Sequence, residues 1–154
     1  MRGALDNRIP PPLVALLVAI AMATVAHFTP GINLPAALRY GVAAALLAFA
    51  LIMGGRAFRA FGRAQTTVNP VDITAASTLV TTGVYRVSRN PMYVSLASVL
   101  TMIAVLLSNG WALLGPVLFI LFITRFQIIP EERAMGELFG GAYTAYRATV
   151  RRWL

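Results

Sequence analysis

Four long apolar runs alternate with shorter connections along the chain. They cover about residues 12–28, 36–53, 92–107 and 111–128. A helix needs about 20 residues to cross the hydrocarbon core of a bilayer, so each run is close to the length of a transmembrane helix. The pattern predicts an all-α membrane protein with about four spans, in a single domain of residues 1–154. The third run is short, which predicts that its ends are buried by the rest of the protein.

The connections between the runs differ in charge. Residues 29–35 and 108–110 carry no charge, whereas residues 56–89 carry five arginines. Positive charge is enriched in cytoplasmic loops, so this basic segment and both termini are predicted to lie in the cytoplasm. We expect an integral protein of a bacterial cytoplasmic membrane. Residues 66–82, which contain six threonines together with alanine, serine and proline, are predicted to form a loop.

Composition supports the membrane assignment. The chain is 58% hydrophobic, whereas soluble domains are about 45–50% apolar. All 13 basic residues are arginine and the formal net charge is +8. The arginines flank the apolar runs and form no dense tract, so they indicate membrane topology and not nucleic-acid binding. With no cysteine and a single histidine, we expect no metal site.

The segment after the last run, residues 130–154, is polar. Gly140 and Gly141 are predicted to divide it into two short helices, with Tyr143 and Arg147 on one face of the second. The segment opens with two adjacent glutamates, Glu131 and Glu132. Adjacent carboxylates beside a bilayer are costly unless a cation meets them, although acids also suit the N-terminus of a helix.

A second group of candidate functional residues precedes the third run. Arg86 and Arg89 can bind a carboxylate or phosphate through their planar guanidinium groups, and Asn90 offers both a donor and an acceptor. Pro91 suits the first turn of a helix. Taken singly, each residue also fits an arginine-rich membrane anchor. The residues of interest are Gly83, Tyr85, Arg86, Arg89, Asn90, Pro91 and Tyr93.

Together the two groups carry a family resemblance. The sequence L-V-T-T-G-V-Y-R, followed by S-R-N-P-M-Y, covers residues 79–93. The C-terminal pattern contains E-E, L-F-G, two tyrosines and R-W within residues 131–153. In this order, around a helical hairpin, they resemble the superfamily of isoprenylcysteine carboxyl methyltransferases and phospholipid methyltransferases. The resemblance covers roughly the second half of the chain.

The resemblance implies a methyltransferase that uses S-adenosylmethionine and releases S-adenosylhomocysteine. The donor would be bound at the cytoplasmic ends of the last spans, under the C-terminal segment, and a lipid or other lipophilic acceptor would enter laterally from the membrane. Arg89, Tyr93 and Glu132 are the predicted catalytic residues. The predicted cofactor-binding residues are Gly83, Tyr85, Arg86, Arg89, Asn90, Pro91, Tyr93, Glu131, Glu132, Tyr143 and Arg147.

The charges of this donor match the residue types. Its amino group needs an anion, for which Glu131 or Glu132 is suitable, and its carboxylate needs a donor such as Arg89 or Asn90. A sulfonium is favoured over an aromatic face such as that of Tyr93. Methyl transfer is an in-line displacement, so alignment and desolvation can suffice without a strong base.

Several alternatives stay open from the sequence. The carboxyl methyltransferases proper tend to have histidine where Asn90 stands, which bears on the acceptor more than on the donor. A lipid amine, a thiol and a carboxylate are all compatible acceptors, and the oligomeric state is undetermined. The competing functions are a membrane reductase of the sterol-reductase type that uses NADPH, and a catalytically inactive scaffold of the same fold.

Overall fold

The computed structural model describes residues 8–64 and 78–154. These residues contain helices and turns and no β-strand, so the all-α prediction is confirmed. In chain order the elements are α1 (Pro11–Phe28), α2 (Ala36–Ala64), a 3-10 turn (Gly83–Arg86), α3 (Pro91–Leu107), a second 3-10 turn (Trp111–Leu113), α4 (Leu114–Ile123), a π-helical turn (Thr124–Ile128) and α5 (Ile129–Thr149).

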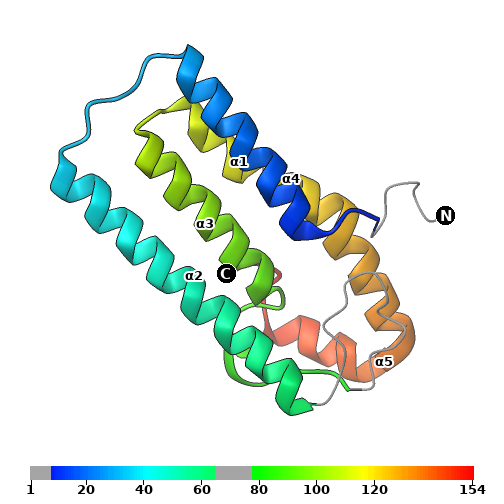
Figure 1. The fold of residues 1–154 in the computed structure, drawn as a ribbon. Coiled ribbons are helices and arrows are strands. Elements are labelled where there is room, and N and C mark those ends of the chain that lie inside the picture. Colours follow the sequence, from blue (N-terminus) through cyan, green and yellow to red (C-terminus); the bar gives the residue numbers. More distant parts are fainter. Residues whose placement is uncertain (1–7, 65–77) are drawn as a thin grey trace.

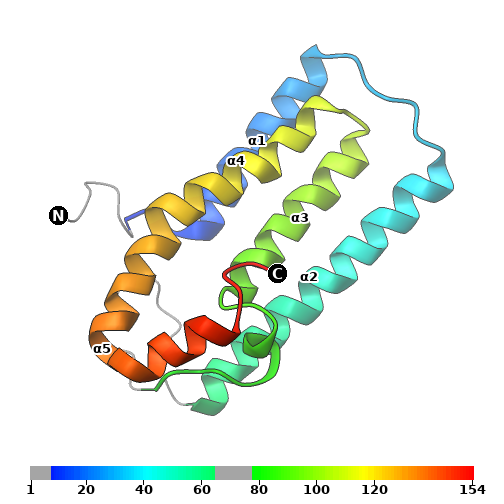
Figure 2. The same ribbon diagram turned by 180° about the vertical axis from the view of Figure 1, so that it is seen from behind.

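Helix α3 occupies the middle of the bundle. It packs against α2 on one side and against α1 and α4 on the other (Figures 1 and 2). Helices α1 and α2, and the continuous helical run that begins at Trp111, are long and apolar enough to cross a membrane. Helix α3 is also apolar but has only 17 residues. The short third run is therefore the central helix. Its first end is buried at Pro91, as predicted, whereas Leu106 near its second end is exposed, so the predicted burial holds for one end only.

The spans depart from the predicted boundaries in two places. Helix α2 continues beyond residue 53 to Ala64, so its arginine-rich end extends past the apolar run. The last span continues without a break into the C-terminal segment as far as the kink at Gly140, and its apolar part ends near Ile128. The predicted loop 66–82 lies outside the described residues up to position 77, and residues 78–82 are irregular as predicted.

Small residues bring α2 and α3 close together. Ala43, Ala50 and Ala57 are buried at a spacing of seven residues along α2. The Ser95 hydroxyl of α3 donates a hydrogen bond of 2.8 Å to the carbonyl oxygen of Ala50 and so links the two helices. Small residues and side-chain hydrogen bonds of this kind are common devices for joining helices within a membrane, where hydrophobic burial gives little driving force.

We expect Gly54→Val to destabilise the α2–α3 contact, whereas Gly55→Val should be tolerated. A Cβ atom at Gly54 would lie 2.8 Å from the Ser95 hydroxyl oxygen, and one at Gly55 would meet nothing within 4 Å. Overpacking typically costs about 1–3 kcal/mol. The melting temperature of the detergent-purified protein should fall for the first variant only. Equal melting temperatures for both variants would contradict this account of the packing.

Gly140 divides α5 as the sequence predicts. Its φ of 51° and ψ of −121° are not helical, and a positive φ is favourable for glycine because it has no Cβ atom. The second half of α5 consequently turns back beneath the bundle and carries the chain towards the start of α3 (Figure 2). This change of direction places residues 150–154, here called the C-terminal tail, beside residues about 60 positions earlier in the sequence.

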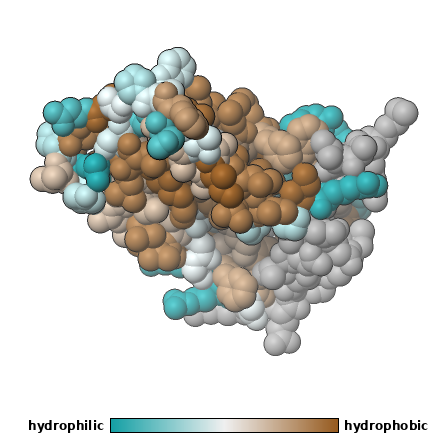
Figure 3. All heavy atoms as spheres, turned by 45° about the horizontal axis from the view of Figure 1, so that its top comes forward, coloured by the Kyte–Doolittle hydropathy of each residue, from teal (hydrophilic) through white to brown (hydrophobic). Residues whose placement is uncertain are grey.

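The two ends of the bundle differ in charge. In the view of Figure 3, apolar side chains dominate the middle of the described surface and hydrophilic residues gather towards its sides. The end that contains the start of α3 and all of α5 is called the arginine-rich end. The opposite end contains the uncharged connections 29–35 and 108–110, but it also contains Arg39 in the first turn of α2. The prediction from the connections and termini did not cover Arg39, which lies at the end opposite the other arginine groups.

Candidate functional site

An ion cluster at the arginine-rich end joins the segment just before α3, helix α5 and the C-terminal tail. The Glu132 carboxylate accepts a hydrogen bond of 2.7 Å from Arg89 Nη2, and bonds of 2.9 and 2.7 Å from Nε and Nη2 of Arg152. Glu132 is only 8% exposed. A buried carboxylate of this kind requires paired cations, and the two arginines supply them.

The electrostatic balance of Glu132 favours its charged form. Burial alone would raise the pKa of this carboxyl group, but the hydrogen bonds and positive charges of Arg152 and Arg89 outweigh burial and lower it. Glu132 is therefore ionised at neutral pH and holds two arginines from distant parts of the chain in one place.

Glu131 faces a different environment although it is the adjacent residue. Its Oε1 atom accepts a hydrogen bond of 2.6 Å from the Tyr93 hydroxyl and one of 2.7 Å from Gln127 Nε2. No arginine of the described residues forms an ion pair with it. Burial raises the pKa of the Glu131 carboxyl group to about 7, although the two hydrogen bonds oppose the shift. The two glutamates thus differ in their neighbours and in their charge state near neutral pH.

The C-terminal tail is fixed to the turn that begins α3. The Arg89 backbone N–H donates to the Arg151 carbonyl at 2.9 Å, and Asn90 Nδ2 donates to the Arg152 carbonyl at 2.9 Å. Arg89 Nη1 also donates to the Val150 carbonyl at 3.1 Å. Trp153 Nε1 donates to the Thr124 hydroxyl of the π-helical turn at 3.1 Å. Arg89 and Asn90 therefore both hold the tail, and Arg89 in addition binds Glu132.

Tyrosines form the wall between the 3-10 turn and α5. The Tyr146 hydroxyl donates to the Tyr85 carbonyl oxygen at 2.7 Å. Tyr143 is 4% exposed, and its ring centroid lies 6.4 Å from that of Tyr146. Gly83 begins the turn with a φ of 63°, which is favourable for glycine. This packing positions Tyr85 and Tyr143 without giving either a direct bond to the two glutamates.

The structure brings most of the predicted site residues together. Tyr93 reaches Glu131, Arg89 reaches Glu132, Asn90 is bonded to the tail, and Pro91 begins α3. Two predicted residues are less directly involved. Arg86 has an exposed side chain that forms no ion pair with the described residues, and Arg147 contributes its backbone carbonyl oxygen to Arg89 while its side chain is exposed.

Five residues of this network were not among the predicted site residues. A polar residue near the end of an apolar run, such as Gln127, was the signal that could have identified one of them. Arg152 and Trp153 belonged to the C-terminal pattern but were not assigned to the site. The five residues are Ser88, Thr124, Gln127, Arg152 and Trp153.

Comparison with known proteins supports a relation to membrane methyltransferases. The profile of the phospholipid methyltransferase family matches residues 38–142, which include Arg89, Asn90 and both glutamates of the site. An uncharacterized protein of Haemophilus influenzae is 44% identical over 63 residues, which are 41% of this chain and 100% of that relative. No solved structure matches the chain. The match to the family profile, together with the apolar helices, shows that this integral membrane protein belongs to the phospholipid methyltransferase family.

Proposed function

We propose that the protein transfers a methyl group from S-adenosylmethionine to a lipid acceptor at the cytoplasmic face of the membrane. The observation that carries the proposal is the pair of adjacent glutamates, one held by two arginines and the other by uncharged partners only. A zwitterionic amino acid with an added positive charge requires such a mixture of anionic and cationic groups. The family of the chain supports methyl transfer as the reaction.

Glu131 is the better partner for the donor's ammonium group. Both of its hydrogen bonds from described residues go to Oε1, so Oε2 is left for a ligand. Glu132, by contrast, uses both oxygen atoms to bind arginine. An ammonium group gains more from a carboxylate without a cationic partner than from one already neutralised by two. This difference favours Glu131 over Glu132, a choice that the sequence left open.

Arg152 is the better partner for the donor's carboxylate. Arg89 is 9% exposed, and its Nη atoms bind Glu132 and two backbone carbonyl oxygens. Arg152 is 35% exposed and uses Nε and Nη2 for Glu132, so Nη1 can bind a carboxylate. We therefore assign Arg89 a positioning role, in place of the direct contact that the sequence predicted.

The remaining groups fit the reacting part of the donor. When bound, S-adenosylmethionine supplies a methyl group on a sulfonium, and a cation of this kind is stabilised over an aromatic face. Tyr93 is held by Glu131 at the membrane end of the cluster, and Tyr143 is buried nearby in the tyrosine wall. Displacement requires alignment of the acceptor and exclusion of water, which the apolar ends of the spans support. The acceptor reaches this point from the bilayer.

Ligand-induced thermal stabilisation tests the proposed function. S-adenosylhomocysteine should raise the melting temperature of the detergent-purified protein, because a ligand that binds only the folded state stabilises it by RT ln(1 + L/Kd), where L is the free ligand concentration. NADPH should have no effect. Stabilisation by NADPH alone would instead support a reductase, and the absence of any effect of S-adenosylhomocysteine would contradict the proposal. Transfer of labelled methyl groups into a lipid extract separates an active enzyme from an inactive scaffold.

A further inference from the structure

Arg39 lies among neutral polar side chains at the end of the bundle opposite the arginine-rich end. Its Nη2 atom donates to the Tyr40 hydroxyl at 2.9 Å and Nη1 lies 3.4 Å from the Ser108 hydroxyl. Its guanidinium carbon lies 4.8 Å from the centre of the Tyr40 ring. All of these partners are neutral. The Nε atom is buried and has no hydrogen-bond partner among the described residues.

No acidic side chain of the described residues neutralises this charge. Within residues 8–64 and 78–154 the acidic residues are Glu131, Glu132 and Glu137, all of them in α5 at the arginine-rich end. Arginine stays protonated at any physiological pH. A guanidinium in the first turn of an apolar span reaches the interface between the hydrocarbon core and the headgroups. At this depth of a bilayer the abundant anion is the phosphate of a phospholipid headgroup.

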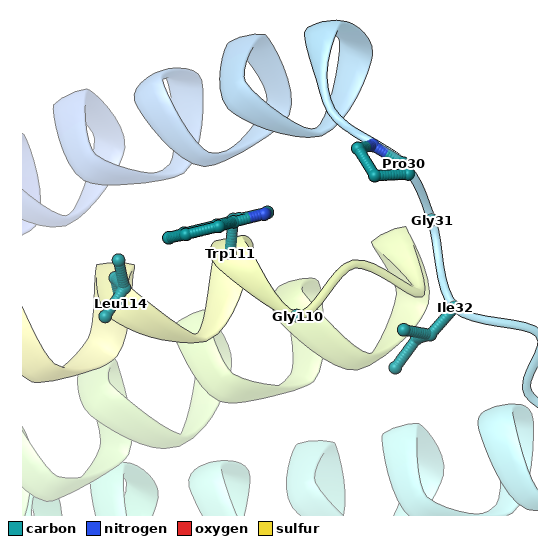
Figure 4. Close-up of a pocket in the computed structure, with 6 residues that line it drawn as sticks. All are labelled: Pro30, Gly31, Ile32, Gly110, Trp111 and Leu114. Carbon is teal, nitrogen blue, oxygen red and sulfur yellow. The ribbon is translucent and has the colours of Figure 1, made fainter.

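A pocket lies beside the connection 108–110, which contains Ser108. It is lined by the connection between α1 and α2 and by the start of the last span, and Figure 4 shows these residues around it. The backbone N–H of Ile32 donates to the Ser108 carbonyl at 2.6 Å, so the turn that contacts Arg39 also forms the edge of the pocket. Most of the lining is apolar: Pro30, Gly31, Ile32, Gly110, Trp111 and Leu114.

We propose that this end of the molecule binds one phospholipid of the opposite leaflet. Its phosphate contacts Arg39, with Tyr40 and Ser108 beside it, and the first part of an acyl chain lies in the pocket against Trp111. The guanidinium fork suits phosphate oxygens, and an exposed tryptophan suits the interface between headgroups and chains. This site is separate from the proposed methyl-donor site, which lies at the other end of the spans.

Native mass spectrometry of the full-length protein tests the proposal. Wild-type protein and His27→Gln, an exposed residue at the same end, should retain equal numbers of dimyristoyl phosphatidylglycerol molecules. Arg39→Gln should retain one fewer and bind this lipid at least tenfold more weakly. Arg39→Lys, which keeps the charge but not the fork, should recover part of the affinity.

Two further ligands distinguish a phospholipid site from a site for acyl chains alone and from a site for a free anion. Dimyristoyl glycerol has the same chains without phosphate and should not bind at this position, and inorganic phosphate should not compete with the phospholipid at equal concentration. Full retention of the lipid by Arg39→Gln would overturn the proposal. Equal binding of the diacylglycerol would also overturn it, because the phosphate would then not be recognised, and effective competition by inorganic phosphate would assign the site to a free anion.

Discussion

Glu131→Gln should weaken the binding of S-adenosylhomocysteine about 100-fold while leaving the fold intact. The amide oxygen of glutamine can still accept the hydrogen bonds from Tyr93 and Gln127, but the neutral group cannot pair with the ligand's ammonium. Loss of a charge-assisted hydrogen bond of about 1.5–3 kcal/mol corresponds to roughly 10- to 150-fold in affinity. Isothermal titration calorimetry gives the affinity, and the melting temperature without ligand reports on the fold.

If Glu131 pairs with the ligand's ammonium group, the affinity for S-adenosylhomocysteine should depend on pH. The pKa of Glu131 is raised to about 7, so below this pH the carboxyl group is increasingly protonated and cannot pair with an ammonium. The affinity of the wild-type protein should therefore rise with pH between about 5.5 and 7, by up to tenfold per unit. In Glu131→Gln this rise should be absent. An unchanged pH profile in the variant would show that another group is responsible and would contradict the assignment of Glu131.

Glu132→Gln should instead destabilise the protein itself. The substitution leaves Arg89, which is 9% exposed, without its anionic partner, and breaking a buried ion pair costs about 3–5 kcal/mol. Because Arg152 is partly exposed, we expect the lower end of this range. The melting temperature in detergent should fall clearly, and limited proteolysis should release the C-terminal tail. The matched control is Glu137→Gln, because Glu137 is exposed on the same helix.

Acid should reproduce the effect of Glu132→Gln. The pKa of Glu132 is lowered in the folded protein from its ordinary value of 4.5. A group of this kind contributes its full stabilisation above the unfolded-state pKa, and the contribution is lost as the pH falls through the folded-state pKa. The difference in melting temperature between wild type and Glu132→Gln should therefore narrow below about pH 4.5. A difference that stays constant down to pH 3 would argue against the ion cluster as its cause.

The helical spans, and the meeting of the candidate residues at one end of the bundle, followed from the sequence because both depend on strong local patterns. Apolar runs of bilayer length leave few alternatives to a helix. The arginine pattern also placed Arg89 and Glu132 at the same end of the bundle. The position of Arg39 was not predicted. The orientation of the spans was predicted from the charges in the connections and termini, and Arg39 lies inside an apolar run.

The different partners of Glu131 and Glu132 could not be predicted from the sequence in the same way. Neighbouring residues on a helix point about 100° apart, so the rotation of α5 decides which one meets Tyr93 and which one meets the arginines. That rotation depends on the π-helical turn at Thr124–Ile128, whose wider backbone shifts every residue that follows. Turns of this type are frequent at functional sites, but the pattern of apolar residues does not predict where they occur.

The fixation of the C-terminal tail also has a consequence for the order of events during synthesis. Residues 150–153 leave the ribosome after the four apolar runs at residues 12–128, yet they supply the carbonyl groups and the guanidinium that complete the environment of Arg89, Asn90 and Glu132. Insertion into the membrane can therefore finish while the two glutamates still lack part of their surroundings. A nascent chain that stops after α5 would be inserted but immature, and maturation of the site would begin only when the tail docks.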